Sequence, residues 1–271
     1  MVIDLKTLYG AEAAEQQKRY EELSAYFAEE FGDANALSYF SAPGRTEVGG
    51  NHTDHNNGKV LAAAVNLDVI AAVKKTENGV IRLKSVGFPM DTVDTADLNV
   101  QEAEKERSAS LIRGVCARLK ALGYEVGGFD AVTTSRVLKG SGLSSSAAFE
   151  VLVVTILSHL YNNDAIDPVE AAQISKFAEN VYFGKPSGLL DQMAASVGGF
   201  TTMDFKDLSA PKIEKIDFDL DRYGYCAVRR RYGRKPCRPD RRVRSHSGGD
   251  EARCEGAWRR SAARGKRGGV L

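Results

Sequence analysis

The chain has 271 residues, of which 43% are hydrophobic and 27% charged, so it can form one large domain or two ordinary ones around a buried core. It contains no run of about 18 apolar residues, and its start lacks the charged-then-apolar pattern of a signal peptide, so we expect a cytoplasmic protein without a membrane span. The formal net charge of +1 conceals a break, because residues 1–225 carry 22 basic and 32 acidic residues whereas residues 226–271 carry 15 and 4.

The first third of the chain predicts one helix and then strands. Residues 11–31 have the amphipathic pattern of a helix, which we expect to end near Gly32. Residues 37–42 alternate and are aromatic, as in a strand. Residues 60–73 are rich in Ala and Val and predict one strand or a pair, and residues 80–85 predict a short strand.

The middle of the chain predicts a helix and a strand that lead into a glycine-rich loop. Apolar residues recur at helical spacing over residues 111–122, and Gly123 follows as a stop signal. Residues 129–133 alternate as in a strand.

The stretch from Gly140 to Val154, GSGLSSSAAFEVLVV, combines two glycines, three serines and an apolar run. Gly140 and Gly142 allow backbone angles that other residues avoid, so a tight loop can form. The apolar run predicts a buried helix, and a serine is a favoured residue at a helix start. Backbone N–H groups at the positive end of this helix would form an anion site, to which serine hydroxyls add donors and a ligand for Mg²⁺. The alternative is an ordinary loop that only caps a core helix.

The next segments predict two further helices. Asp167, followed by a proline and with Glu170 three residues later, is a strong start signal for a helix that runs to about Phe183. Ser187 can cap a short helix that contains Asp191. Helices and strands therefore interleave, which is typical of α+β and α/β proteins.

Three separated segments carry polar residues typical of a binding site. The first is APGRTEVGGNHTDHNNGKVL (residues 42–61), the second is the glycine-serine loop, and the third is AENVYFGKPSGLLDQ (residues 178–192). In their order and spacing these segments resemble the galactokinase branch of the GHMP family of small-molecule kinases. The resemblance covers roughly residues 35–225.

The resemblance implies an α+β fold and a sugar kinase activity. A GHMP-kinase-like N-terminal α/β domain would occupy residues 1–195, followed by the start of an incomplete ferredoxin-like C-terminal domain over residues 196–225 and a disordered basic tail over residues 226–271. The implied reaction is ATP-dependent phosphorylation of galactose at the anomeric hydroxyl, giving galactose 1-phosphate and ADP. The implied partners are galactose, ATP and Mg²⁺, with neither nucleic acid nor a membrane, and the protein would be a monomer.

The resemblance also assigns roles to individual residues. They are the catalytic pair Arg45 and Asp191; the sugar-binding residues Asn51, His52, Asp54 and Gly188; the phosphate loop Gly140, Ser141, Gly142, Leu143, Ser144, Ser145 and Ser146; and the Mg²⁺ ligands Ser146 and Glu179. The chemistry suits these residue types, because phosphoryl transfer needs positioning and charge stabilisation more than covalent help. A carboxylate can accept the proton of the attacking hydroxyl, and an arginine offsets charge on the phosphoryl oxygens.

Two departures from the family pattern bear on the identity of the sugar. The family usually has Glu directly before His-Thr-Asp, where it holds a distal sugar hydroxyl, and Asn51 stands there in this chain. The usual Val-Asn after the arginine is Thr46 and Glu47. One alternative is therefore a kinase for a related sugar such as N-acetylgalactosamine, and another is a non-catalytic regulator that binds galactose and ATP. His52 and His55 could instead suggest a metal pair, but no third ligand is evident.

The basic segment after residue 225 could be a nucleic-acid arm by its charge, but the sequence offers another explanation. Codons for RRYGRKPCRPDRRVR, which runs from Arg230 to Arg244, can be chosen so that dropping the first base gives Val-Asp-Thr-Gly-Gly-Ser-His-Ala-Asp-Leu-Thr-Asp-Glu-Tyr. That is an ordinary strand-turn-helix sequence, similar to what galactokinases carry here. We therefore hypothesise that residues 226–271 come from a shifted reading frame and that their arginines reflect GC-rich codons.

Overall fold

The computed structural model describes residues 4–207, 210–218 and 220 of the chain. The helices of this part are α1 (Leu5–Tyr9), α2 (Ala13–Phe31), α3 (Ser108–Ala121), α4 (Ser145–Tyr161), α5 (Pro168–Phe177) and α6 (Leu190–Val197). Shorter helical segments are η1 (Gly10–Glu12), η2 (Thr53–Asn56), η3 (Glu102–Glu104) and the π-helical η4 (Ala178–Phe183). The predicted disordered tail and the frameshift hypothesis for residues 226–271 lie outside the described residues.

The strands of the described residues form one seven-stranded mixed sheet. They are β1 (Ser38–Gly49), β2 (Lys59–Lys75), β3 (Val80–Ser85), β4 (Met90–Asp94), β5 (Phe129–Ser135), β6 (Phe200–Asp204) and β7 (Lys212–Ile216). The strand order is β4-β3-β5-β2-β6-β7, and β1 pairs with β2. β3 runs parallel to β5, whereas β2 pairs antiparallel with β1, β5 and β6. β2 is long enough that its first half pairs with β6 and its second half with β5.

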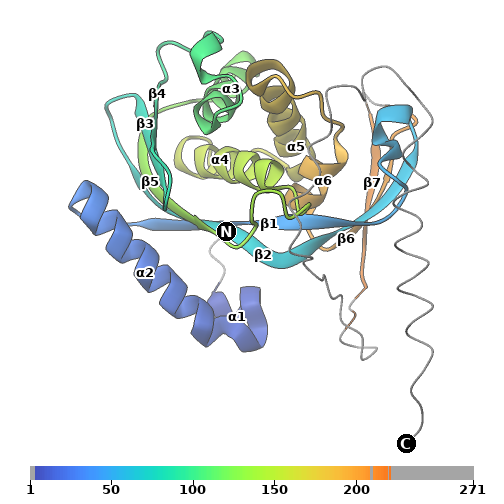
Figure 1. The fold of residues 1–271 in the computed structure, drawn as a ribbon, viewed down its shortest axis with the longest axis horizontal. Coiled ribbons are helices and arrows are strands. Elements are labelled where there is room, and N and C mark those ends of the chain that lie inside the picture. Colours follow the sequence, from blue (N-terminus) through green and yellow to red (C-terminus); the bar gives the residue numbers. More distant parts are fainter. Residues whose placement is uncertain (1–3, 208–209, 219, 221–271) are drawn as a thin grey trace, which may run out of the picture. The chain divides into compact units, whose positions relative to one another are not determined.

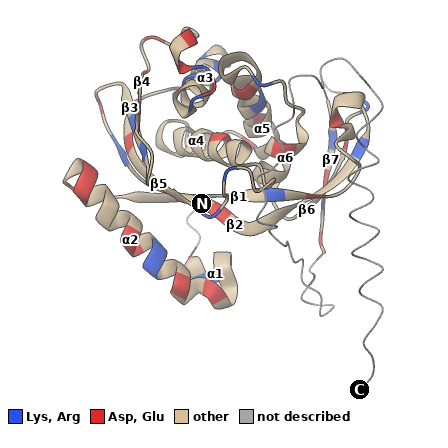
Figure 2. Ribbon diagram, in the orientation of Figure 1, with Lys and Arg blue, Asp and Glu red and all other residues tan. Residues whose placement is uncertain are grey.

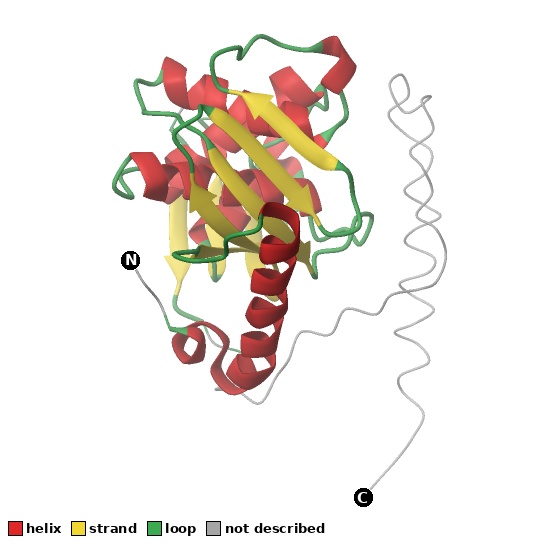
Figure 3. Cartoon of the chain, turned by 90° about the vertical axis from the view of Figure 1, so that its left-hand side faces the viewer, coloured by secondary structure: helices red, strands yellow, loops and turns green. Residues whose placement is uncertain are grey.

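Helices cover both faces of the sheet. Figure 1 shows α3, α4, α5 and α6 on one side of the strands and α1 and α2 on the other, and Figure 3 gives the same layers in a view turned by 90°. Ala71 and Val73 of β2 belong to the core cluster that includes α4, whereas Ile70 and Ala72 belong to the cluster with α2. The predicted apolar stretch 60–73 is therefore one strand, and it is apolar on both faces because both are covered.

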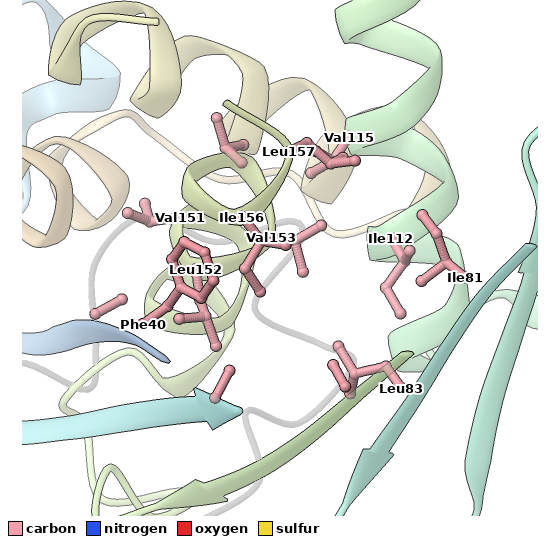
Figure 4. Close-up of a cluster of buried hydrophobic side chains, with 14 of the residues drawn as sticks. Phe40, Ile81, Leu83, Ile112, Val115, Val151, Leu152, Val153, Ile156 and Leu157 are labelled. Atoms are coloured by element: carbon pink, nitrogen blue, oxygen red, sulfur yellow. The ribbon is translucent and has the colours of Figure 1, made fainter. Parts of the chain in front are cut away.

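The larger core cluster packs α3 and α4 against the sheet (Figure 4). Leu152, Ile156 and Leu157 of α4 are fully buried, as are Ile112 of α3 and Leu83 of β3. The prediction of a buried helix after the serines is confirmed, since α4 buries side chains around most of its circumference. This packing fixes the start of α4 and with it the end of the glycine-serine loop.

The amphipathic helix predicted over residues 11–31 is confirmed by α2. Leu23 and Phe27 are fully buried against β2 and β5, whereas acidic residues recur along the helix, as Figure 2 shows. Arg19 is buried and lies 2.5 Å from a carboxylate oxygen of Asp68 on β2, so an ion pair ties the helix to the sheet.

The elements predicted from the sequence agree with most of the structure, with three differences. The helix predicted to run to about Phe183 is α5 followed by the π-helical η4, so its last six residues are wound more widely than an α-helix. The strands β4 and β7 and the helix α1 were not predicted. β4 (MDTVD) and β7 (KIEKI) are short and rich in charge, and neither carries an apolar run.

The strands β6 and β7 lie in the region where the start of a C-terminal domain was predicted. Both join the same sheet as the earlier strands, and the division of the chain at residue 195 stays a prediction. None of the helices among the described residues has the length and apolar character that a membrane span requires.

The packing of α4 generates a prediction about stability. Leu152→Ala would leave a cavity between α4 and the sheet, so we expect the free energy of unfolding to fall by about 3 kcal/mol. Leu122→Ala is the matched control, because Leu122 is 41% exposed and its truncation should change that free energy by less than about 0.5 kcal/mol. Urea unfolding of both variants measures the difference, and equal effects would contradict the central place of α4 in the core.

Candidate active site

The centre of the candidate site is an ion pair between Arg45 on β1 and Asp191 on α6. Nε and Nη2 of Arg45 lie 2.7 and 2.6 Å from Oδ1 of Asp191. Nη1 of Arg45 donates to the carbonyl oxygen of Gly142 at 2.8 Å. The β1–β2 ladder shifts register between Pro43 and Arg45, and such bulges redirect side chains beside functional sites. One buried guanidinium thus joins the first strand, the glycine-serine loop and α6.

The glycine-serine loop has the backbone that its glycines predict. Gly140 and Gly142 have φ values of +76° and +71°, in the region that favours glycine. Ser144 occupies the cap position of α4, but its hydroxyl makes no hydrogen bond to the first turn of the helix. It donates instead to Oδ2 of Asp191. The hydroxyl is therefore part of the site, and the first amides of α4 keep the unpaired N–H groups that a helix start presents to anions.

A second acidic centre lies on Glu179 of the π-helical segment η4. Ser146 and Lys185 donate to its Oε1 at 2.9 and 2.7 Å, and Gln192 donates to its Oε2 at 2.7 Å. The Glu179 side chain is 2% exposed, whereas that of Lys185 is 54% exposed, so the lysine can leave while the carboxylate stays. The carboxylate and the Ser146 hydroxyl are hard oxygen donors side by side, which fits a divalent cation such as Mg²⁺.

The predicted sugar-binding residues Asp54 and Gly188 lie against each other. Oδ2 of Asp54 accepts from the backbone N–H of Leu190 at 3.1 Å, and a Cβ on Gly188 would fall 1.7 Å from the same oxygen. Gly188 therefore allows the backbone to approach the carboxylate. The predicted cap by Ser187 is wrong: Ser187 donates to the side chain of Asn180 instead, and Asp54 supplies the acceptor for the start of α6.

The other two predicted sugar-binding residues, Asn51 and His52, form the turn before η2. Both have left-handed backbones, with φ of +53° and +51°. The carboxylate of Glu47 accepts from the backbone N–H of His52 at 2.8 Å and lies 3.2 Å from its Nε2. The alternative of a metal pair gains no support, because no three His, Cys, Asp or Glu side chains in the described part of the chain converge as a metal site.

Sequence reasoning missed Glu150, a fully buried acid on α4 beneath the second centre. Gln192 donates to its Oε2 at 3.2 Å, and no partner reaches Glu150 Oε1 or Gln192 Oε1 within the described residues. Burial raises the pKa of Glu150 well above its usual value of 4.5, and the charge of Glu179 raises it further. Its place in an apolar helix is the one signal that the sequence offered. Lys185 was also missed, although it lies within the third quoted segment.

The two acidic centres share their supporting segments. Ser144 and Ser146 come from the same loop, and Asp191 and Gln192 are neighbours on α6. The structure thus brings together the predicted phosphate loop, the predicted catalytic pair and the predicted cation ligands, while the roles of these residues stay predictions.

Comparison with known proteins gives matches over the two regions of the chain that carry the residues of this site. The family model described as "Galactokinase galactose-binding signature" matches residues 25–75, and the model "GHMP kinases N terminal domain" matches residues 110–199. The galactokinase of Lactococcus lactis subsp. lactis (strain IL1403) is 34% identical over 203 residues, which cover 74% of this chain and 51% of that protein. The chain belongs to the galactokinase branch of the GHMP kinases. It spans about half the length of the curated relatives it matches, at 51% of this one.

Solved structures of GHMP kinases show the same fold. The crystal structure of Lactococcus lactis galactokinase complexed with galactose is 32% identical and matches with a TM-score of 0.68 over 74% of this chain and 52% of that chain. A D-glycero-D-manno-heptose 1-phosphate kinase from Bacteriodes thetaiotaomicron, 23% identical, matches in fold with a TM-score of 0.57 over 68% of this chain and 62% of that chain. The predicted GHMP-kinase-like α+β fold is therefore confirmed for the region that these matches cover.

The contact between Asp54 and Gly188 generates a prediction. Gly188→Ala would force Asp54 or the start of α6 to move, so we expect the free energy of unfolding to fall by about 2 kcal/mol. Gly49→Ala is the matched control, because a Cβ there meets nothing within 4 Å. Urea unfolding compares the two variants, and a Gly188→Ala protein as stable as Gly49→Ala would contradict this close approach.

The buried acid on α4 generates a prediction about pH. The folded state binds the Glu150 proton more tightly than the unfolded state, so stability declines as the pH rises above 4.5 toward the raised folded pKa. Glu150→Gln removes this dependence, and we expect it to raise the free energy of unfolding by about 1 kcal/mol at pH 8 and to change it little below pH 4.5. Thermal and urea unfolding over this pH range measure the effect against the exposed control Glu77→Gln. A variant less stable than wild type at pH 8 would overturn the argument.

Proposed function

We propose that the chain carries the site of an ATP-dependent galactokinase-type sugar kinase, an activity that phosphorylates galactose at the anomeric hydroxyl to form galactose 1-phosphate and ADP and that needs the restored reading frame. The observation that carries the proposal is the carboxylate of Asp191, held by Arg45 and Ser144 beside the glycine-serine loop. Hydrogen bonds thereby link Asp191, the candidate base, with the positively charged guanidinium of Arg45 and with the glycine-serine loop, the candidate phosphate-binding loop. Galactokinases from Lactococcus lactis and Bacillus subtilis, both 34% identical over the matched residues, support this reaction.

In this reaction Asp191 would accept the proton of the anomeric hydroxyl as that oxygen attacks the γ-phosphate. Arg45 holds Oδ1 and Ser144 binds Oδ2, so the carboxylate is fixed before the sugar arrives. The same guanidinium would offset negative charge that develops on the phosphoryl oxygens. Pre-organisation of this kind is what phosphoryl transfer requires of the protein.

The sugar would lie against the segment from Asn51 to Asp54 and the backbone at Gly188. Oδ1 of Asp54 is buried and has no hydrogen-bond partner within the described residues, so a sugar hydroxyl would supply its missing donor. The relative from Lactococcus lactis was solved in complex with galactose, which supports galactose as the sugar. Asn51 keeps a kinase for a related sugar such as N-acetylgalactosamine as the alternative.

The triphosphate of ATP would lie on the loop from Gly140 to Ser146 and on the first amides of α4. Ser146 and Glu179 would hold Mg²⁺, which when bound neutralises charge on the phosphates. The hydrogen bond between these two side chains supports this pairing, and the exposed Lys185 would yield its place to the ion. A monomeric state and a cytoplasmic location stay predictions.

The reaction is tested by an assay of galactose phosphorylation with Mg-ATP. We expect background activity from the 271-residue chain and activity from a version whose reading frame is restored near codon 226. In the restored version, Asp191→Asn should lower turnover by about a thousandfold because the base is lost. Stabilisation by ATP should persist in that variant, since the phosphates bind the loop. Asp94→Asn on the exposed edge strand β4 is the matched control.

The outcomes of this assay test the frameshift hypothesis, the proposed reaction and the role of Asp191 separately. Full activity in the 271-residue chain would overturn the frameshift hypothesis. Failure of both versions to phosphorylate galactose would overturn the proposed function, and near-normal turnover in Asp191→Asn would remove Asp191 from the chemistry.

A further inference from the structure

Glu47 occupies an unusual position for an acid near the end of β1. The side chain of Glu47 is only 14% exposed although the residue lies near the C-terminal end of the strand, whereas the side chain of His52 is 56% exposed. Its two carboxylate oxygens are both directed to His52, one to the backbone N–H at 2.8 Å and one to Nε2 at 3.2 Å. The β1–β2 ladder shifts register again between Glu47 and Gly49, so a bulge sets this side chain against the turn.

The turn that receives this carboxylate is strained. Asn51 and His52 are consecutive residues with left-handed backbones, a conformation that asparagine tolerates and histidine adopts less readily. Such a backbone persists only where its surroundings hold it. Glu47 supplies an acceptor for the N–H of His52, at the point where the chain enters η2 and continues to the buried Asp54.

The two departures from the family pattern form one exchange in this geometry. The family usually has Asn at the position of Glu47 and Glu at that of Asn51, so this chain carries the same two residue types in reversed order. The asparagine now stands in the left-handed turn, which suits it, and the carboxylate comes from the strand. The exchange keeps one negative charge at this end of the site.

We propose that Glu47 is the positioning residue for His52, fixing the left-handed turn and the imidazole so that the ring can bind a hydroxyl of the sugar. In the neutral imidazole, donation from Nε2 to Glu47 leaves Nδ1 as an acceptor for that hydroxyl. The proposal rests on the proposed function for the identity of the ligand, and on the contacts of Glu47 for the positioning.

Galactose binding by the 271-residue chain, measured by calorimetry, tests the ligand side of the proposal. Glu47→Ala should raise the Kd for galactose by about tenfold, Glu47→Gln by less, and neither should change the Kd for ATP. Glu77→Gln, whose side chain in wild type is 90% exposed, is the matched control.

A double-mutant cycle tests whether Glu47 acts through His52. In a His52→Ala background, Glu47→Ala should change the Kd by less than about twofold, because the ring it positions is already gone. Multiplying effects would overturn the positioning role, as would wild-type affinity in Glu47→Ala.

Hydrogen exchange of the His52 amide, without any ligand, gives an independent measurement. Glu47→Ala should speed this exchange by about tenfold relative to wild type and to Glu77→Gln, because the carboxylate acceptor is lost. Unchanged exchange overturns the proposal. A chain that shows the expected exchange but binds no galactose even after its reading frame is restored near codon 226 contradicts the proposed function alone.

Discussion

The contact between Arg45 and Asp191 is the constraint around which the site is built. Arg45 stands on β1 and Asp191 on α6, and the same guanidinium binds the carbonyl of Gly142. Burying a charge is costly unless it is paired, so strand, loop and helix must meet for this arginine to be tolerated. The packing of α3 and α4 in the core fixes the end of the glycine-serine loop, and the bulge in β1 fixes the position of Arg45.

At the second centre, around Glu179, the buried hydrogen-bond acceptors outnumber the donors that reach them. Glu150, Glu179 and Gln192 are buried together, and two of their oxygens have no partner within the described residues. Lys185 reaches only Glu179, and does so from solvent. Buried oxygens without hydrogen-bond donors cost stability, and a cation bound by oxygen ligands would offset part of that cost. That imbalance supports the proposal that Ser146 and Glu179 hold Mg²⁺.

Local signals in the sequence predicted those features that local physics controls. Asp167 accepts from the amides of Val169 and Glu170 as its position predicts, and the loop glycines have the expected positive φ. Ser187 failed as a cap because the acceptor for α6 comes from Asp54, far away in sequence. The charged edge strands β4 and β7 carried no apolar run, since their pairing comes from neighbours and not from their own pattern.

Two of the three serines behind the two glycines have separate roles in this arrangement. Ser144 turns away from the helix to bind Asp191, and Ser146, two residues later, binds Glu179. α6 also contributes to both centres, since Asp191 belongs to the first centre and its neighbour Gln192 to the second. The start of α4 and the facing helix α6 each contribute residues to both centres, and together they fix the distance between the proposed base and the proposed cation site. Small hydroxyls suit this task, because they bind carboxylates while leaving the backbone amides of α4 accessible to a phosphate.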